Sequence, residues 1–494
     1  MKGASKFCNI LAGLILLGAQ TVALQAQETE NPPQTYPLSL EQATQIALQN
    51  NFDIQLTKYD TWIARTDKQV AESIYDTIFA AEVEYSNDQS KRTSTILGTK
   101  TVDNDYNVGL SKKLPTGTTL SVDLENNRNF NNAVFASSPL THDSTLGVTV
   151  EQDLGKNIFG VQDRGDIKIT LKDIENAEYT TLRKIEASVQ EVQKAYWDLA
   201  LQMENVKIEE AMVAEARKLY DLHQEKLKDG LVEVGEAIAS EANYESRKND
   251  LLLARNEVRA KNNTLRLLLN IEKDVDIEPV DAFDLPENGE ALLPAMQRAF
   301  ANRQDYKKAH NEIDAKDITL SMKKNNLWPE INLTATLERN GLGDHFEQAV
   351  TQITDEDNPN FFAGLAVTLP LENNEARGEL KAAELEKAKS IVQLKLVERK
   401  IAVDIADRVR NCNIFRESAL NRQQIARLQG MKMEEEEKRF RYGRSDTDTL
   451  IRFQEDVVRA KSDVASAIYR YHAALVVLRE TEGVLLKEYW KGEL

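Results

Sequence analysis

Cysteine is nearly missing from this chain of 494 residues, which contains only Cys8 and Cys412. Cys8 lies in an N-terminal segment that we expect to be removed, so we expect no internal disulfide in the remaining chain. Aromatic residues are also few, at 6% of the chain, whereas charged residues make up 29%. This composition favours long solvated helices over a compact core rich in aromatic side chains.

The sequence also lacks the patterns that mark catalytic and metal sites. Its five histidines are dispersed and show no spacing typical of metal ligands. It contains no nucleophile elbow, phosphate-binding loop or zinc motif. We therefore expect no enzyme activity, no metal and no cofactor. The net charge of −18 offers no basic face for phosphate groups, which argues against a nucleic-acid partner.

Long hydrophobic runs are absent, apart from a short one near the N-terminus. Lys2 and Lys6 precede the mostly apolar stretch from Ile10 to Leu17, and the small residues Ala23 and Ala26 follow it. This order predicts a signal peptide over residues 1–26, and hence export. The competing interpretation is a short membrane anchor, but the run is below the roughly 20 residues that a membrane-spanning helix needs. No other segment is apolar enough to span a membrane as a helix.

The chain contains an internal duplication. The stretch IALQNNFDIQLTKYD (Ile46 to Asp60) is echoed by RAFANRQDYKKAHNE (Arg298 to Glu312), and Gly230 and Gly443 each interrupt a long helical pattern. The first correspondence has an offset of 252 residues and the second an offset of 213, so the first copy has 39 extra residues between these landmarks. An internal repeat of this kind is stronger evidence for the architecture than any single motif.

Short segments of alternating apolar and polar residues predict strands with one apolar face. The first copy has four, around residues 81–85, 106–110, 120–124 and 146–150, and the second has two, around 331–337 and 361–369. The sequence LPTG (Leu114 to Gly117) predicts a turn between the middle two of the first copy. We interpret the extra residues as one additional hairpin. We expect the segments 340–346 and 355–360 to be external loops.

Each group of strands is followed by a very long helical pattern, over residues 166–229 and 379–442. Each pattern ends at its glycine, and a second helix follows. Apolar residues at alternating steps of three and four, as in coiled coils, mark residues 450–478 after the second glycine and residues 185–206 before the first. Glycine is the preferred residue at a helix C-terminus because it adopts a left-handed conformation. We therefore predict two antiparallel helix hairpins, whose tips both point away from the strands.

These patterns give a division of the chain into a signal peptide and two structural repeats. The signal peptide covers residues 1–26. The first repeat covers 38–285, with a helix, strands at 81–154 that include the extra hairpin, and a helix hairpin at 166–270 with its tip at 228–235. The second repeat covers 286–490, with a helix, strands at 330–371 and a helix hairpin at 379–482 with its tip at 441–446.

The strands need a place to bury their apolar face. In an exported chain with strands at one end of long helices, a β-barrel in an outer membrane provides that place. Four to six strands do not close a barrel, because the smallest closed barrels have about eight, so several copies must contribute strands to one barrel. The alternative is a secreted periplasmic coiled-coil scaffold without a pore, which has no use for strands with one apolar face.

The order of these pieces resembles the TolC family of outer-membrane efflux proteins, over nearly the whole chain from about Leu38 to Leu485. The segments that carry the resemblance are SLEQATQIALQNN, LWPEINLTA, VTLPL, EKLKDGLVEVGEA and the glycine-tip segment RFRYGRSDTDTLIRFQEDVVRAK. The resemblance implies a mainly α-helical fold with a β-barrel portion. It implies a homotrimer whose membrane β-barrel is continued by a periplasmic α-helical barrel.

The resemblance also implies a passive outer-membrane exit duct. The duct would receive its substrate from a periplasmic adaptor protein and an inner-membrane transporter, and it would have no catalytic centre. Members of the family contribute four strands per chain and twelve per trimer. Because six candidate strands are present here, either the extra hairpin caps the rim of the barrel or the barrel has eighteen strands.

The resemblance finally implies two kinds of site residue near the tips. The family narrows its duct with acidic residues shortly after the tip glycines, where a ring of like charge can select among ions. The candidates here are Glu236, Asp446 and Asp448, and the competing interpretation of the two aspartates is that they stabilise a helix N-terminus. The candidate adaptor contacts are Gly230, Leu231, Val232, Gly443, Arg444 and Ser445. The run of glutamates at 434–437 is interpreted as a solvated helix face.

Overall fold

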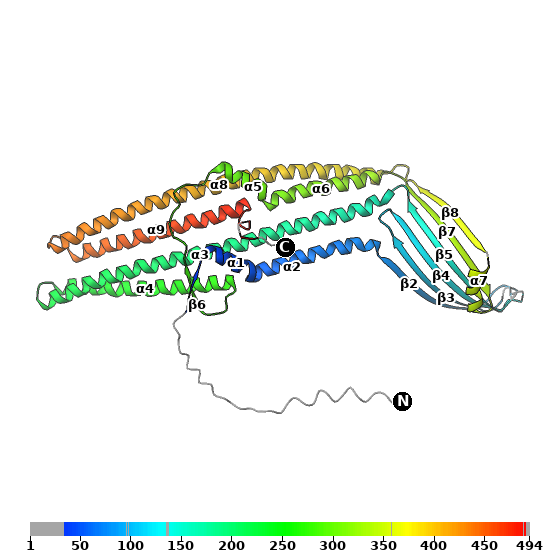
Figure 1. Ribbon diagram of the computed structural model, residues 1–494, viewed down its shortest axis with the longest axis horizontal. Helices are drawn as coiled ribbons and strands as arrows, with labels where there is room; N and C mark the ends of the chain where they lie inside the picture. The colour runs from blue at the N-terminus through cyan, green and yellow to red at the C-terminus, as the bar shows by residue number, and fades with distance from the viewer. Residues whose placement is uncertain are drawn as a thin grey trace, which may run out of the picture.

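The structure is a computed structural model that describes residues 34–490, apart from residues 95, 97, 135–137, 357 and 488. The expected signal peptide, residues 1–26, lies outside the described residues. The molecule is elongated, with a curved sheet at one end and the tips of two helix hairpins at the other (Figure 1). Within residues 34–490, no helix carries a stretch long and apolar enough to cross a membrane.

The duplication is preserved in the helices. The α3 and α8 helices both have 68 residues, which corresponds to a length of about 100 Å, and α4 and α9 both have 36 residues. The first repeat contains α1 (Leu40–Asn50), α2 (Phe52–Glu72), α3 (Val161–Lys228) and α4 (Val234–Leu269). The second contains α5 (Leu292–Asn302), α6 (Gln304–Asn325), α8 (Asn374–Arg441) and α9 (Thr447–Glu482).

The two repeats share a sharp break between their first two helices. Asn51, between α1 and α2, has an extended backbone with φ −62° and ψ 128°, and its side chain caps α2 by accepting a hydrogen bond from the amide of Ile54. Arg303, between α5 and α6, has φ −57° and ψ 128°. The two residues are related by the same 252-residue offset that appears in the sequence. The repeated sequence therefore specifies a repeated bend.

Both long helices begin five residues before the positions expected from the sequence, at Val161 and Asn374. The connection from the sheet is tight because Asn157, with φ +62°, turns the chain in a left-handed conformation. Its side-chain oxygen then accepts a hydrogen bond of 2.9 Å from the amide of Gln162 in the first turn of α3. Asn373 has φ +46° just before α8.

The six predicted strands form one antiparallel sheet, as expected. They are β2 (Thr77–Asp88), β3 (Thr101–Lys113), β4 (Thr118–Asn131), β5 (Leu140–Asp153), β7 (Glu330–Gly343) and β8 (Pro359–Thr368). Their order in space is β2-β3-β4-β5-β7-β8, so neighbours in sequence are also neighbours in the sheet. The pairing of β5 with β7 joins the two repeats into a single curved layer (Figure 1).

The expectation of external loops at 340–346 and 355–360 was wrong in part. Strand β7 continues to Gly343, and the short helix α7 (Phe346–Asp355) follows it. Ala349 and Ile353 are buried where α7 packs on β5 and β7. A Cβ atom on Gly341 would lie 2.0 Å from the carbonyl oxygen of Ala349, so the glycine permits this close approach.

A second, two-stranded parallel sheet was not predicted. It pairs β1 (Gln34–Leu38) with β6 (Val275–Pro279), midway along the helices (Figure 1). The hydroxyl of the buried Tyr196 on α3 donates to the carbonyl of Leu38 at 3.0 Å and also contacts a carboxylate oxygen of Asp281. This small sheet holds the first described residues against the segment that links the two repeats.

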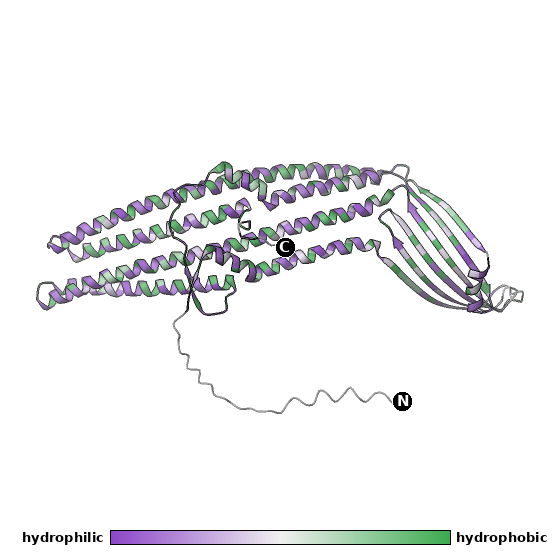
Figure 2. Cartoon of the chain, viewed as in Figure 1, coloured by the Kyte–Doolittle hydropathy of each residue, from purple (hydrophilic) through white to green (hydrophobic). Residues whose placement is uncertain are grey.

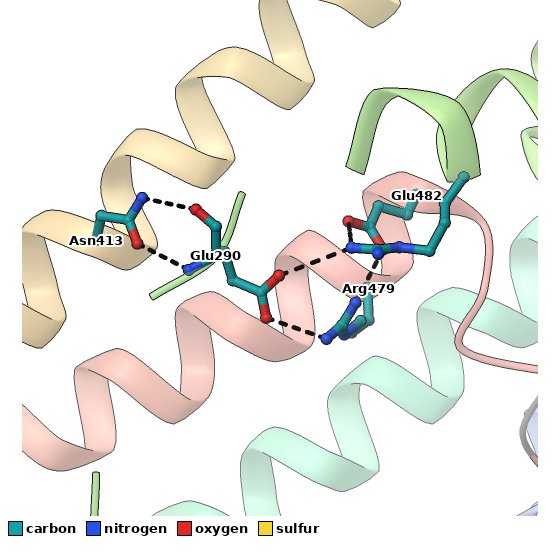
Figure 3. A network of polar contacts seen from close by, with 5 residues as sticks. Glu290, Asn413, Arg479 and Glu482 are labelled. Carbon is teal, nitrogen blue, oxygen red and sulfur yellow. Dashed lines mark hydrogen bonds and ion pairs between the residues drawn. The ribbon is translucent and has the colours of Figure 1, made fainter. Parts of the chain in front are cut away.

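A network of polar contacts fixes the start of the second repeat to its hairpin (Figure 3). The amide and carbonyl of Glu290 both bond to the side chain of Asn413 on α8, at 2.9 and 3.0 Å. The Glu290 carboxylate accepts from Arg479 on α9 at 3.0 Å. The fully buried Glu482 carboxylate receives two hydrogen bonds of 2.7 Å from Arg298 on α5. The negative charge of the buried Glu482 carboxylate is therefore compensated within the network.

Candidate functional site

The first hairpin tip is a tight turn centred on Gly230. The glycine has φ +66°, and the amide of the next residue, Leu231, donates to the carbonyl of Lys226 at 2.8 Å. The Gly230 amide donates to the carbonyl of Leu227 at 3.1 Å. These two bonds close the end of α3 in the pattern of a Schellman motif, in which glycine is favoured at the left-handed position.

The second tip has the same turn, with the two equivalent hydrogen bonds. Gly443 has φ +69°, the Arg444 amide donates to Arg439 at 2.8 Å, and the Gly443 amide donates to Phe440 at 3.0 Å. No atom lies within 4 Å of the position that a Cβ would take on either Gly230 or Gly443. The two glycines are therefore required by the backbone conformation and not by a lack of space.

The candidate adaptor contacts lie at the surface of both tips, with two exceptions. Gly230, Gly443 and Arg444 are exposed, whereas Val232 and Ser445 are partly buried. Leu231 is 73% exposed, and it is followed by two more exposed apolar residues, Val234 and Ile238, on the first turns of α4. The first tip therefore presents apolar side chains to a partner or to solvent.

The run of glutamates beside the second tip is not uniformly solvated. Glu434 and Glu435 are exposed, but Glu436 is buried, and it accepts a hydrogen bond from the hydroxyl of Ser445. The interpretation of the run as a solvated face was thus wrong for Glu436. This side chain ties the end of α8 to the turn because its face of the helix packs inward.

The three candidate gate residues all lie at the start of the returning helices. Glu236 occupies the first turn of α4, and Asp448 the first turn of α9, where it is exposed. Asp446 is the N-cap of α9, and it accepts hydrogen bonds from the amide of Thr449 at 2.7 Å and from its hydroxyl at 3.0 Å. These bonds hold the pKa of Asp446 below its usual range. The geometry therefore favours the capping interpretation for Asp446.

The two hairpins meet near their tips through a buried histidine that the sequence does not mark as special. His223 on α3 has no exposed surface, and its Nε2 atom lies 3.2 Å from the hydroxyl of Thr447, the first residue of α9. The ring of Phe440 on α8 packs edge-on against it, with 5.9 Å between ring centroids. Its Nδ1 atom is buried and has no hydrogen-bond partner among the described residues. Burial lowers the pKa of His223.

At the other end of the molecule, the sheet has one apolar face. Directly paired residues lie on the same face. The pairings join one residue from each strand into a continuous apolar row: Phe79, Leu110, Val122, Val148, Leu337 and Phe361. Every one of these side chains except Val148, at 36%, is more than 36% exposed. Hydrophilic and hydrophobic residues alternate visibly along the strands in Figure 2.

The opposite face of the sheet is polar and acidic. By the same pairings it carries carboxylates on five strands: Glu82, Glu84, Asp103, Asp105, Asp123, Glu125, Asp143, Glu151, Glu330 and Glu338. The apolar face carries no acidic residue within the six described strands. Glu84 and Asp105 are directly paired, although like charges at such positions repel. This face is therefore suited to water and cations, and not to a protein core.

The sheet is a single layer. Among the described elements, α7 is the only helix longer than one turn that contacts the middle or far part of the sheet. A sheet with one apolar face is normally covered by a second layer of secondary structure. An extended apolar face of this kind marks a surface that is buried against another molecule or a membrane.

Comparison with known proteins agrees with this geometry. Residues 295–484 match the family model described as outer membrane efflux protein. The chain is similar to the CmeC outer membrane channel of Campylobacter jejuni, with 14% identity over 90% of this chain and 85% of that one, and a TM-score of 0.62. It is also similar to the open state of the MtrE outer membrane channel of Neisseria gonorrhoeae, with 16% identity over 90% and 88% of the two chains, and a TM-score of 0.64.

The VceC outer membrane protein of Vibrio cholerae is a third similar structure, with 14% identity over 90% of this chain and 96% of that one, and a TM-score of 0.62. No curated protein sequence gives a significant match. The fold is therefore that of outer membrane channels in which long helix hairpins are joined to a sheet. The chain is therefore similar to outer membrane efflux proteins over residues 295–484, and it shares the fold of outer membrane channels over most of its length.

Proposed function

We propose that three copies of this chain form a passive exit duct across an outer membrane, as the TolC-like fold implies. The sheets form the wall of a membrane barrel, and the helix hairpins form a tunnel in the periplasm. The observation that carries this proposal is the apolar row from Phe79 to Phe361, which continues across all six strands of an uncovered layer. Lipid buries such a face, while the acidic face lines a water-filled interior.

The alternative of a coiled-coil scaffold without a pore does not explain this sheet. A soluble scaffold would leave the apolar row in water, at a cost of roughly 25 cal/mol for each Å² of apolar surface. A scaffold without a pore also does not explain why the opposite side of the same single layer is polar.

In this proposal the tips receive the substrate. The exposed apolar residues at Leu231, Val234 and Ile238 and the exposed Arg444 provide contacts for a periplasmic adaptor protein, which is bound in turn to an inner-membrane transporter. Glu236 is the strongest candidate for a constriction charge, because Asp446 is already used as a helix cap. Three-fold symmetry would place three copies of Glu236 around one axis, where they attract cations.

A cysteine crosslinking experiment in cells tests the adaptor contact. Leu231→Cys and Arg444→Cys are expected to capture an adaptor protein with a short crosslinker. The matched control is Leu253→Cys, because Leu253 is also exposed, at 59%, but lies well along α4 from the tip. Capture at Leu253 with equal yield, or no capture at either tip, would contradict the proposed role of the tips.

Reconstitution into a planar lipid bilayer tests the duct itself. The purified trimer is expected to give discrete conductance steps at constant voltage. A protein that binds the bilayer and gives no steps, with or without Glu236→Gln to relieve the constriction, would contradict a pore function.

A further inference from the structure

The structure bears on how many strands line the exit of this duct. We propose that β2 of one copy pairs antiparallel with β8 of the next, and that the barrel closes with eighteen strands whose wall includes the β3–β4 hairpin. This inference rests on the proposed function for the number of copies. The strand number per copy, the polarity of the edges and the place of the hairpin come from the structure.

The β3–β4 hairpin is an integral part of the sheet. It lies between β2 and β5 in the strand order, and β3 and β4 are paired with their neighbours along their full lengths. With 13 and 14 residues, these two strands are as long as β2, β5 and β7, which have 12, 14 and 14 residues. A hairpin folded over the rim would leave β2 to pair with β5, and here those strands are separated by two others.

The turn of this hairpin is anchored at the helical end of the sheet. A Cβ atom on Gly160, just before α3, would lie 2.4 Å from the carbonyl oxygen of Pro115 in the turn. A Cβ atom on Gly117, which has φ +74°, would lie 3.0 Å from the amide nitrogen of Gly160, and the Gly117 carbonyl accepts a hydrogen bond from the amide of Asp153 at 3.3 Å. Lys113 forms an ion pair of 2.8 Å with Asp163 on α3. The turn therefore belongs to the periplasmic end of the wall and not to the outer rim.

Both edges of the sheet are open. All residues of β2 are exposed except the last, Asp88, and all residues of β8 are exposed except Gly364. Unpaired strand edges are unfavourable in lipid, because each unsatisfied backbone group costs several kcal/mol there. Neither edge has a partner strand within the described chain.

A second copy of the same chain fits these edges. In an antiparallel sheet with six strands, the first and last strands run in opposite directions, so β8 of one copy can continue the antiparallel order at β2 of the next. The apolar face also continues, because Phe79 and Val83 on β2 share a face with Phe361 and Leu365 on β8. Six strands in each of three copies make eighteen.

This count changes the shape of the exit. The diameter of a barrel grows roughly in proportion to its strand number. An eighteen-stranded barrel is therefore about 1.5 times as wide as the twelve-stranded barrel that the family resemblance implies. The helices of the two hairpins are not changed by the extra strands, so the duct is expected to widen where it meets the membrane.

Cysteine pairs on the polar face test the wall. In the double variant Ala80→Cys/Ala366→Cys, one cysteine lies on β2 and the other on β8, near the helical end of the sheet. A short bismaleimide crosslinker, applied to the purified trimer, is expected to join neighbouring copies and give covalent dimers and trimers. Neither single variant should give them. The native Cys412 competes poorly, because burial raises the pKa of its thiol to about 12 and the thiolate is the reactive form.

A second pair distinguishes the two arrangements of the hairpin. Ala80→Cys/Thr149→Cys places the cysteines on β2 and β5, which the wall arrangement keeps three strand spacings apart, or about 14 Å. Efficient crosslinking of this pair within one chain would overturn the eighteen-stranded wall and leave the trimeric duct intact, whether or not β2 and β8 also crosslink between copies. A native mass spectrum without a trimer would instead contradict the proposed function.

Discussion

The Nε2 atom of His223 on α3 lies 3.2 Å from the Thr447 hydroxyl on α9, and this contact joins the two hairpins beside their tips. The ring faces the neutral side chains of Phe440 on α8 and Thr447 on α9. The charged groups that act on it are Glu236 on α4, which favours protonation, and Lys226 on its own helix, which opposes it. Burial outweighs Glu236, so the pKa of His223 is lowered and the ring is neutral.

Acid is therefore expected to loosen the junction between the hairpins. Because the pKa of His223 is lower in the folded state than its ordinary value of about 6.5, the unfolded or open state takes up a proton first as the pH falls. The stability of the junction is then lost progressively below about pH 6.5. Hydrogen exchange of the first turns of α9, corrected for the intrinsic pH effect, should show reduced protection at about pH 5.5 relative to about pH 7.5.

The matched control for this prediction is His223→Gln. Its amide nitrogen can replace Nε2 as a donor to Thr447 but does not titrate in this range. Protection in the variant should be independent of pH, apart from a loss of up to about 1 kcal/mol at neutral pH. An equal drop in protection in both proteins would assign the pH effect to another group.

A second titrating group acts in the opposite direction. Glu186 on α3 is buried, and its desolvation, together with Glu480 on α9, raises its pKa to about 8. An acid with a raised folded-state pKa is stabilising at low pH, and its contribution is lost as the pH rises from about 4.5 to about 8. Holding this carboxyl protonated at pH 7 costs about 3 kcal/mol as an upper estimate.

Glu186→Gln should therefore raise the melting temperature, and the gain should increase between about pH 5 and about pH 8. Glutamine keeps the shape of the side chain and is never charged. The exposed Glu41→Gln is the control, and it should change the melting temperature little at any pH. A gain from Glu186→Gln that does not vary with pH would show that the carboxyl is not protonated in the native state.

Substitution by alanine should lower the stability of the protein at a tip glycine and raise it at a glycine inside a helix. Gly443→Ala is expected to destabilise the protein by about 1–2 kcal/mol, because φ +69° is unfavourable for any residue with a Cβ. Gly430→Ala, within α8, should stabilise it by about 1 kcal/mol, since alanine is the better helix former and a Cβ there meets no atom within 4 Å. Melting temperatures measured side by side check both signs, and a stabilising Gly443→Ala would contradict the turn geometry.

The acidic face of the sheet should make the pore selective for cations. Replacing the directly paired Glu84 and Asp105 by Gln and Asn is expected to lower the cation-to-anion permeability ratio about twofold in dilute salt. Reversal potentials in a salt gradient measure this ratio. The control Glu41→Gln/Glu272→Gln removes two exposed charges outside the sheet and should leave the ratio unchanged. An unchanged ratio in the first variant would place that face away from the ion path.

The parts of the fold that could be predicted are those specified by local patterns. Each strand contains a stretch in which apolar and polar residues alternate, so all six strands of the main sheet were predicted. The glycines at 230 and 443 mark turns by their own conformational preference. The helix α7 was missed because it has only ten residues, about three turns, and follows closely after a strand.

Contacts between distant segments could not be predicted in this way. His223 and Thr447 are separated by 224 residues, and no period in the sequence indicates that their helices pack in this register. The pairing of β1 with β6 was also not predicted, because strands of 5 residues are too short to show a clear alternation of apolar and polar residues. Acidic residues near the tips suggested gates, but only the structure shows that Asp446 is engaged as a cap.

The central claim is a three-fold duct, and electron cryomicroscopy of the protein extracted from membranes in detergent tests it most directly. The account predicts a three-fold tube with a detergent belt around the sheet end, a helical stalk of about 100 Å and an open axial channel. Such a map would also count the strands of the wall. A soluble particle without a detergent belt, or a particle with no central channel, would contradict the account.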